Sequence, residues 1–381
     1  MPTLNDDEIK ARIADGSISA ITIDTQIFDK YGCNLRYALL RKLDQFRGGN
    51  IAVLISEIVA GEIKSHIAKD AAETLRALNS AVKSHRKRWL LAEADSTLSA
   101  TFRTTEDAAL IAAEQLAEYL EAIDGKILPA TEPATVAPEV LRRYFAADPP
   151  FEASEKKKHE FPDAFALLSL EAWAAQRHTL VLCVSGDGGW RDFSEQSERL
   201  VWVSDLTQAL SFFNDSGRTV ADHTVALLRA GESPEFTAEV SRAFEYRLDD
   251  QDYHIEAWSA LEFEAEPLSA VLQSVDWESA SPPVVVAADD ECVTFTMRLI
   301  ATVEFEALFS YHHYDSFDRD YTSLGSEEES VQRDIEFELA IEVSREEPLQ
   351  IVQVEVAKRF FEVNFGEVEP FKHEDPTHEK Y

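Results

Sequence analysis

The chain has few cysteines, no long apolar run and too few basic residues to balance its acids. Its three cysteines, Cys33, Cys183 and Cys292, are odd in number and far apart, so they form neither a disulfide framework nor a metal-ligand spacing. No apolar stretch approaches the roughly 18 residues that cross a bilayer, and the first residues are too polar and acidic for a signal peptide. We therefore expect a cytoplasmic protein without membrane contact.

The shortage of basic residues is uneven along the chain. Lys and Arg number 36 against 71 Asp and Glu, which gives a net charge of −35. Residues 214–381 hold 39 acidic and 12 basic residues, a net charge of −27, which leaves −8 for residues 1–213. Because phosphate contacts rely on Lys and Arg, we expect any nucleic acid to bind the first half. The acidic half either meets a basic protein partner or serves solubility.

The 381 residues are enough for two domains, and the first half alternates short apolar runs with amphipathic segments. The runs predict buried strands at 19–24, 51–55, 179–184 and 200–203. The amphipathic segments predict helices at 34–47, from 57 past Glu62 to about 91, at 105–123, 139–145 and 162–176, and after a cap at Ser204. This alternation predicts a three-layer α/β/α domain with a parallel sheet over residues 1–213 and a helical insertion at about 68–150.

After residue 218 the pattern changes. A helix is predicted at 219–230, and from 235 onward apolar residues alternate with Glu, Arg or Thr, beginning with "EFTAEVSRAFEYRL". A two-residue period is typical of half-exposed strands, so residues 219–381 predict an acidic, mostly antiparallel β domain. The polar segment 314–334 predicts a long mobile loop.

Four acidic residues follow or adjoin the predicted strands of the first half. Asp24 ends the run in "AITIDTQIF", and Asp187 follows the run in "HTLVLCVSGD". Glu62 lies about two turns into the helix after the second strand, and Asp163 opens a helix behind Pro162. The carboxyl ends of parallel strands border the usual active-site crevice. Crowded carboxylates there favour one or two hard divalent cations, which indicates a metal-dependent hydrolase.

The segments around these acids resemble those of PIN-domain nucleases, most closely a bacterial PIN-like subgroup with a helical insertion. The matching segments are "TIDTQIF", "ISEIVAGEIKSHI", "KKKHEFPDAFALLSL" and "VSGDGGWRDF", within about residues 18–213. The resemblance implies cleavage of phosphodiester bonds, most often in RNA, with Mg²⁺ or Mn²⁺ held by the catalytic acids Asp24, Glu62, Asp163 and Asp187. It also implies an endoribonuclease in a toxin–antitoxin or defence setting, and a homodimer.

Other residues near these acids are candidates for supporting roles. Asp192 is a candidate fifth metal ligand, although "GDGGWRDF" is two residues longer than the family's tighter acid-x-acid-Phe pattern. Thr25 and Ser185 are candidates to orient the metal ligands by hydrogen bonds.

Candidate substrate contacts lie on both sides of the acids. Lys157, Lys158 and Arg191 are placed to hold phosphates, and Trp190 either stacks on a base or packs internally. Arg142, Arg143 and the segment "SHRKRW" at 84–89 are candidates for a second basic surface, whereas the scattered histidines predict no chemistry.

The same sequence features allow three alternatives to a nuclease. The acids could belong to a catalytically silent PIN-like scaffold that works through its acidic β domain. A haloacid-dehalogenase-like phosphatase is disfavoured because Gln26 stands where its second Asp would be. A P-loop NTPase is disfavoured because no Gly-rich loop ends in Lys-Ser or Lys-Thr.

Overall fold

The structure of the chain is a computed structural model, which describes residues 4–89, 107–132, 134–151, 160–214, 216–249, 253–315, 320–346, 348–357 and 361–369. The chain divides into two compact units, Met1–Ser216 with Val285–Ala287, and Gly217–Val284 with Ala288–Tyr381. Among the helices of the described ranges, none is both long and apolar enough to cross a membrane.

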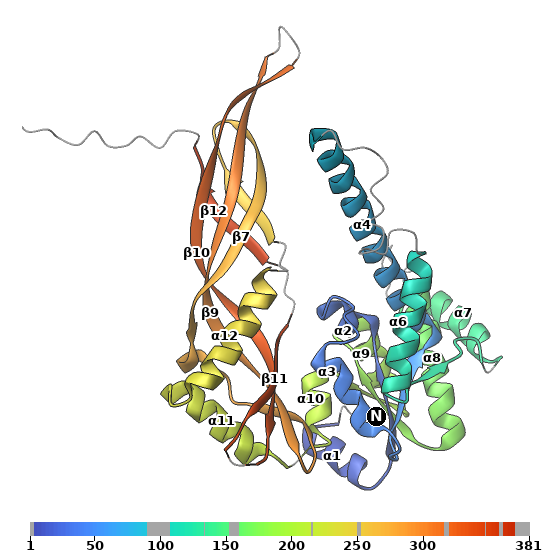
Figure 1. Cartoon of the computed structure of the whole chain (residues 1–381). Coiled ribbons are helices and arrows are strands. Elements are labelled where there is room, and N and C mark those ends of the chain that lie inside the picture. Colours follow the sequence, from blue (N-terminus) through green and yellow to red (C-terminus); the bar gives the residue numbers. More distant parts are fainter. Residues whose placement is uncertain are drawn as a thin grey trace, which may run out of the picture. The chain divides into compact units, whose positions relative to one another are not determined.

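A five-stranded parallel sheet lies at the centre of the first unit (Figure 1). Its strands are β1 (Ile18–Ile23), β2 (Ala52–Ser56), β3 (Lys126–Leu128), β4 (Leu180–Val184) and β5 (Leu200–Val203). Their order is β3-β2-β1-β4-β5, and every neighbouring pair is parallel. All five residues of β4 are buried, as expected of a strand covered on both faces. The sheet and its flanking helices confirm the predicted α/β/α architecture.

The helices of this unit connect the strands. They are α1 (Asp6–Ala14), α2 (Thr25–Lys30), α3 (Ala38–Arg41), the 3₁₀ helix η1 (Lys42–Phe46), α4 (Glu57–Trp89), α6 (Ala108–Ala122), α7 (Val136–Ala146), α8 (Phe161–Arg177), α9 (Gly188–Gln196) and α10 (Leu206–Ser211).

Three sequence predictions for this unit need correction. The single helix predicted at 34–47 is two short pieces, α3 and η1, because the chain tightens to 3₁₀ geometry at Lys42. The predicted helical insertion at 68–150 contains β3, which pairs with β2 and extends the sheet. The cap of α10 is Asp205, not Ser204, because the Asp205 carboxylate accepts the amide hydrogens of residues 207 and 208.

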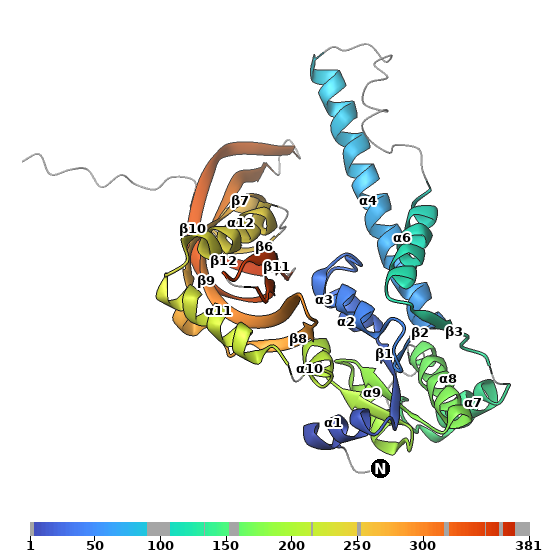
Figure 2. The same cartoon turned by 60° about the horizontal axis from the view of Figure 1, so that its bottom comes forward.

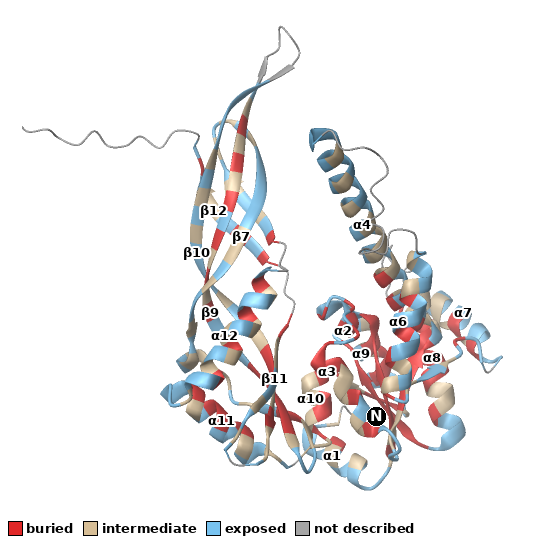
Figure 3. Ribbon diagram, in the orientation of Figure 1, coloured by how far each residue is buried: buried red, intermediate tan, exposed pale blue. Residues whose placement is uncertain are grey.

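Helix α4 extends well beyond the sheet (Figures 1 and 2). Its buried residues, Val59, Ala60, Ile63 and Ile67, all lie in its first third, where α6 also packs against it. The remainder of α4 is exposed or half-buried (Figure 3), and its last turn carries Arg86, Lys87 and Arg88. Packing therefore fixes the end of α4 that carries Glu62, while the far end presents basic side chains to solvent.

The second unit begins with two helices, α11 (Arg218–Ala230) and α12 (Pro234–Asp249). The strands that follow are β6 (Tyr253–Trp258), β7 (Glu262–Asp276), β8 (Val284–Ala288), β9 (Cys292–Asp315), β10 (Asp320–Ser344), β11 (Ile351–Val356) and β12 (Phe361–Glu367), with the 3₁₀ helix η3 (Trp277–Ser279) after β7. Strands β11, β10, β9 and β7 form an antiparallel sheet, and β6 pairs with β12 in parallel. The predicted antiparallel β domain is confirmed.

Two predictions for this unit were wrong. The segment 235–248 is helix α12, not a strand, because its buried residues Phe236, Val240, Phe244 and Leu248 recur every four positions. The segment 314–334, predicted as a mobile loop, is mostly strand β10. Its hydrogen-bond partners come from β9, and every second β9 residue from Val293 to Tyr311 is buried.

Candidate active site

Two of the candidate acids meet at the switch point of the parallel sheet. The chain passes from β1 to β2 and β3 on one side and then returns to β4 on the other, so β1 and β4 are neighbours. Asp24 directly follows β1 and begins α2, while Asp187 follows β4 and begins α9. The Asp24 N–H donates to the carbonyl of Val184 at 2.9 Å, which joins the two strand ends. Such a switch point is the usual binding crevice of an open α/β sheet.

A short hydrogen-bond network orients these two carboxylates. The Ser185 hydroxyl donates to Asp24 Oδ2 at 2.7 Å and accepts the Asp187 N–H at 2.9 Å. Asp187 Oδ1 caps α9 by accepting the amide hydrogens of Gly189 at 2.7 Å and Trp190 at 3.3 Å. A Cβ at position 189 would lie only 3.0 Å from Asp187 Oδ1, so glycine allows this close approach.

The other two acids come from helices beside the same strand ends. Glu62 lies in α4, and its Oε2 accepts a 2.5 Å hydrogen bond from the Thr25 hydroxyl of α2. Asp163 lies in the first turn of α8, and its Oδ1 accepts a 3.0 Å hydrogen bond from the Trp190 indole of α9. Each of the four carboxylates is therefore held by a hydrogen bond from a neighbouring element or from the turn that it caps.

Burial makes Asp24 hard to ionise. Only 5% of the residue is exposed, and this burial is the main reason that its pKa rises to about 7. The Ser185 hydrogen bond lowers the pKa, whereas the charges of Asp163 and Asp187 raise it. In the absence of a cation, a proton on Asp24 relieves the repulsion among these acids.

Asp163 behaves in the same way. Burial raises its pKa to about 6, against the lowering effect of the Trp190 hydrogen bond. Repulsion from Asp187 and Glu62 is a smaller part of the same rise. These interactions connect Asp24, Glu62, Asp163 and Asp187 into one acidic cluster. Carboxylate oxygens are the type of ligand that hard divalent cations such as Mg²⁺ or Mn²⁺ prefer.

Among the described residues, the other candidates predicted to bind metal or substrate do not join the cluster of four acids. Asp192 forms an ion pair with Arg191 at 2.9 Å, and both side chains are about half exposed. Trp190 is fully buried, so it packs internally and offers no face to a base, contrary to one of the two sequence interpretations. Lys157 and Lys158 lie outside the residues that the structure describes.

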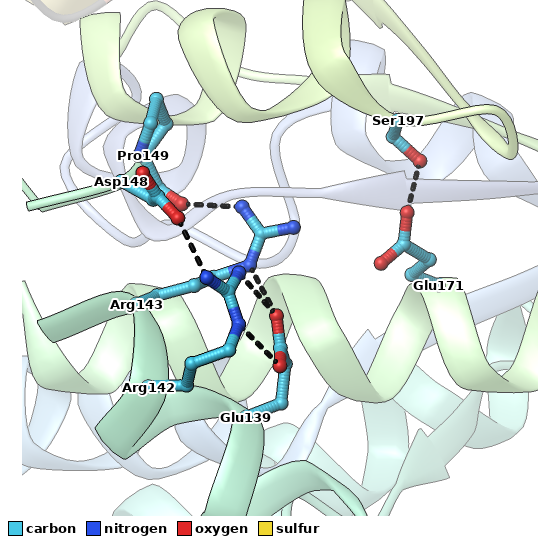
Figure 4. A network of polar contacts seen from close by, with 7 residues as sticks. All are labelled: Glu139, Arg142, Arg143, Asp148, Pro149, Glu171 and Ser197. Atoms are coloured by element: carbon cyan, nitrogen blue, oxygen red, sulfur yellow. Dashed lines mark hydrogen bonds and ion pairs between the residues drawn. The ribbon is translucent and has the colours of Figure 1, made fainter. Parts of the chain in front are cut away.

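Arg142 and Arg143 do not form the second basic surface that the sequence suggested. Both guanidinium groups bind Glu139, Arg142 also binds Asp148 at 2.8 Å, and Arg143 donates to the carbonyl of Pro149 at 2.8 Å (Figure 4). Glu139 and Arg142 line a cavity of about 1160 Å³ along α7 and α8, which none of the four clustered acids lines. The carboxylates of Glu139 and Asp148 neutralise the charges of these two arginines, so neither arginine is a good candidate to bind substrate phosphates.

A second group of potential metal ligands was not predicted from the sequence. Asp29 of α2, Cys33 and His66 of α4 bring three potential metal-ligating atoms within 4.8 Å of one another. Cys33 and His66 are too far apart in sequence to form a recognisable motif. A signal was nonetheless present, because Asp29 and His66 each follow a site residue, Thr25 and Glu62, by four positions on a helix.

The first unit is thus a parallel sheet flanked by helices, with four carboxylates close to its switch point. Residues 21–190 match the family model described as PIN domain, so the first unit of this chain contains a PIN domain. The match includes all four acids, and the PIN fold is a nuclease fold that acts on nucleic acids. Searches of curated proteins and of solved structures found no match.

The Ser185 hydroxyl gives a direct test of how the acidic cluster is oriented. We expect Ser185→Ala to weaken Mn²⁺ binding by about 10- to 100-fold, because Asp24 loses the hydroxyl that orients its Oδ2. Calorimetric titration with Mn²⁺ measures the affinity. Ser194→Ala is the matched control, since Ser194 is also buried in this unit but its hydroxyl has no hydrogen-bond partner among the described residues. Equal Mn²⁺ affinities in the two variants would contradict the role of Ser185.

Proposed function

We propose that this protein is a Mg²⁺- or Mn²⁺-dependent nuclease that hydrolyses phosphodiester bonds, and specifically an endoribonuclease. The observation that carries the proposal is the coupling of Asp24, Glu62, Asp163 and Asp187 at the switch point of a PIN domain. Membership of the family favours RNA over DNA and makes a toxin–antitoxin or defence setting the expected biological context.

The four carboxylates would hold the cation. A divalent cation there supplies Lewis-acid stabilisation of the phosphoryl oxygens and lowers the pKa of a water molecule toward neutrality. Its binding displaces the proton that Asp24 holds below its raised pKa of about 7. Cation binding is therefore expected to release protons between pH 5 and 7, whereas carboxylates with ordinary pKa values would release almost none.

Neighbouring side chains orient the clustered carboxylates by hydrogen bonds. Ser185 and Thr25 fix the carboxylates of Asp24 and Glu62 by hydrogen bonds. The buried indole of Trp190 donates a hydrogen bond to Asp163 Oδ1, so a protein group takes the place of water at that oxygen. Such preorganisation lowers the reorganisation needed when charge develops on the phosphate.

Substrate phosphates need a basic surface, because the acidic cluster repels them until a cation is bound. The exposed end of α4 offers Lys87 and Arg88 next to Trp89, whose side chain is 70% exposed. Basic and aromatic side chains together suit a single-stranded nucleic acid, with the charges holding phosphates and the ring stacking on a base. We therefore propose that the far end of α4 binds the RNA and that this binding weakens with salt.

The proposed function is tested with labelled single-stranded RNA and DNA of the same sequence, incubated with Mn²⁺, Mg²⁺ or a chelator. We expect internal cleavage of the RNA with either metal and none with the chelator. Equal cleavage of both substrates would correct the assignment to RNA. If a folded protein with bound Mn²⁺ cleaves neither substrate under a range of salt concentrations, the nuclease assignment is wrong.

A further inference from the structure

We propose that Asp29, Cys33 and His66 form a second metal site, distinct from the acidic cluster and suited to Zn²⁺. Asp29 Oδ1 lies 2.7 Å from His66 Nδ1 and 3.2 Å from Cys33 Sγ, and Cys33 Sγ lies 3.9 Å from His66 Nδ1. One carboxylate oxygen, one thiol and one imidazole nitrogen therefore converge on a single point from two helices and a turn.

The distances are close to those that a bound zinc ion requires. Zinc bonds of about 2.3 Å to sulfur and about 2.0–2.2 Å to nitrogen or oxygen place tetrahedral ligand atoms roughly 3.3–3.6 Å apart. The observed separations of 2.7, 3.2 and 3.9 Å bracket this range. Small side-chain rotations are enough to open the Asp29–His66 pair and close the Cys33–His66 pair, while the backbone stays in place.

The backbone around Cys33 aims its side chain back at α2. Gly32 and Cys33 both have a positive φ, +61° and +50°, which a residue with a side chain seldom adopts. The Cys33 N–H donates to the carbonyl of Phe28 at 2.8 Å, so the turn folds over the end of the helix. The His66 side chain of α4 is 44% exposed, and its contact with Asp29 Oδ1 at 2.7 Å orients the ring. The three ligands are thus held by local structure before any ion binds.

The ligand types separate this site from the acidic cluster. Thiolate and imidazole favour Zn²⁺ and similar borderline ions, whereas oxygen-only sites favour Mg²⁺ and Mn²⁺. The three protein ligands leave the fourth zinc position to water. The two sites should therefore take up different metals from a mixture, even though the Asp29–His66 pair lies one helical turn from the Thr25–Glu62 hydrogen bond.

The alternative is that Cys33 serves as a catalytic nucleophile with His66 as its base. The geometry disfavours this role. The Cys33 thiol donates its hydrogen to Asp29 instead of being deprotonated by His66, which lies 3.9 Å away. Cys33 is 5% exposed, so a substrate has poor access to its sulfur. A metal ion is better matched to this arrangement, because it satisfies all three side chains simultaneously.

Co²⁺ titration of the full chain tests the proposal independently of nuclease activity. The titration uses an Asp24→Asn, Asp187→Asn background, so that the acidic cluster does not take up the metal. We expect about one equivalent of Co²⁺ to bind with a thiolate-to-cobalt charge-transfer band, and added Zn²⁺ to abolish that band. An oxygen-only site gives no such band, so this readout does not depend on the proposed function.

Matched variants locate the site. Cys33→Ser should remove the charge-transfer band, and His66→Gln, which keeps the thiol, should weaken Co²⁺ binding at least about tenfold. Cys292→Ser and the exposed His223→Gln should change neither. Circular dichroism checks that each variant is folded. The proposal is overturned if the folded parent shows no charge-transfer band, or if Cys292→Ser removes the band as fully as Cys33→Ser does.

Discussion

Replacing Asp24 and Asp187 together by asparagine is expected to lower metal-dependent cleavage by at least about 1000-fold. The substitution removes two negative charges from the acidic cluster, and a loss of roughly 4 kcal/mol of transition-state stabilisation gives this factor. The fold should survive, because an asparagine oxygen can still accept the Ser185 hydroxyl at position 24 and the Gly189 and Trp190 amide hydrogens at position 187. Initial rates on labelled RNA with Mn²⁺ measure the effect.

Asp205→Asn provides the matched control for this variant. Like Asp187, Asp205 follows a strand and caps a helix, and its carboxylate accepts two amide hydrogens of that helix. It follows β5 instead of β4, so we expect the control to retain nearly all activity. If the double variant is folded and still cleaves RNA at the wild-type rate, these carboxylates are not the catalytic centre.

The second large effect is on stability in the absence of metal. Asp24 and Asp163 have folded pKa values of about 7 and 6, both above the ordinary value of 3.8. The folded protein therefore binds these protons more tightly than the unfolded chain, so their contribution is most favourable below about pH 4 and is lost as pH rises to about 7. The clustered acids thus make the metal-free protein less stable at neutral pH than it would be without them.

Asp24→Asn should consequently stabilise the metal-free protein. We expect its gain in the free energy of unfolding to be larger at pH 8 than at pH 5 by on the order of 2 kcal/mol. Urea denaturation of the full chain with a chelator present measures this gain. Saturating Mn²⁺ should reverse the ranking, since a ligand at about 100 times its Kd adds about 2.7 kcal/mol to the protein that binds it. A gain that is independent of pH would mean that Asp24 is ordinarily ionised.

Much of the first unit follows from short sequence patterns. Strands β1, β2, β4 and β5 are apolar runs with sharp ends, and all of them lie within one residue of the predicted ranges. Asp24 directly follows β1, and Asp187 lies three residues after the end of β4. The rule that the carboxyl ends of parallel strands meet at one edge therefore predicts that the two acids lie close together. The prediction worked because each step depended on local pattern and a general rule of topology.

The wrong or missing predictions concern segments whose structure depends on contacts with distant parts of the chain. In α12, apolar residues spaced by four also resemble an alternating strand when Glu and Arg lie between them, and only the packing of one face distinguishes the two. In β10, the acidic residues led to the prediction of a mobile loop. The segment is a strand because β9 pairs with it along its length, apart from one irregularity between Ser323 and Gly325. Asp29, Cys33 and His66 meet because α2 packs against α4. The four-residue spacing of Asp29 and His66 from two site residues indicates a shared helix face, but it does not show that the two helices touch.

Anomalous diffraction from crystals soaked in Mn²⁺ and measured near the manganese absorption edge tests the metal site directly. We expect a peak bounded by the carboxylates of Asp24, Glu62, Asp163 and Asp187, and we expect the Asp24→Asn, Asp187→Asn variant to lose it. Crystals that carry Mn²⁺ elsewhere on this acidic protein but show no peak among these four carboxylates would contradict it.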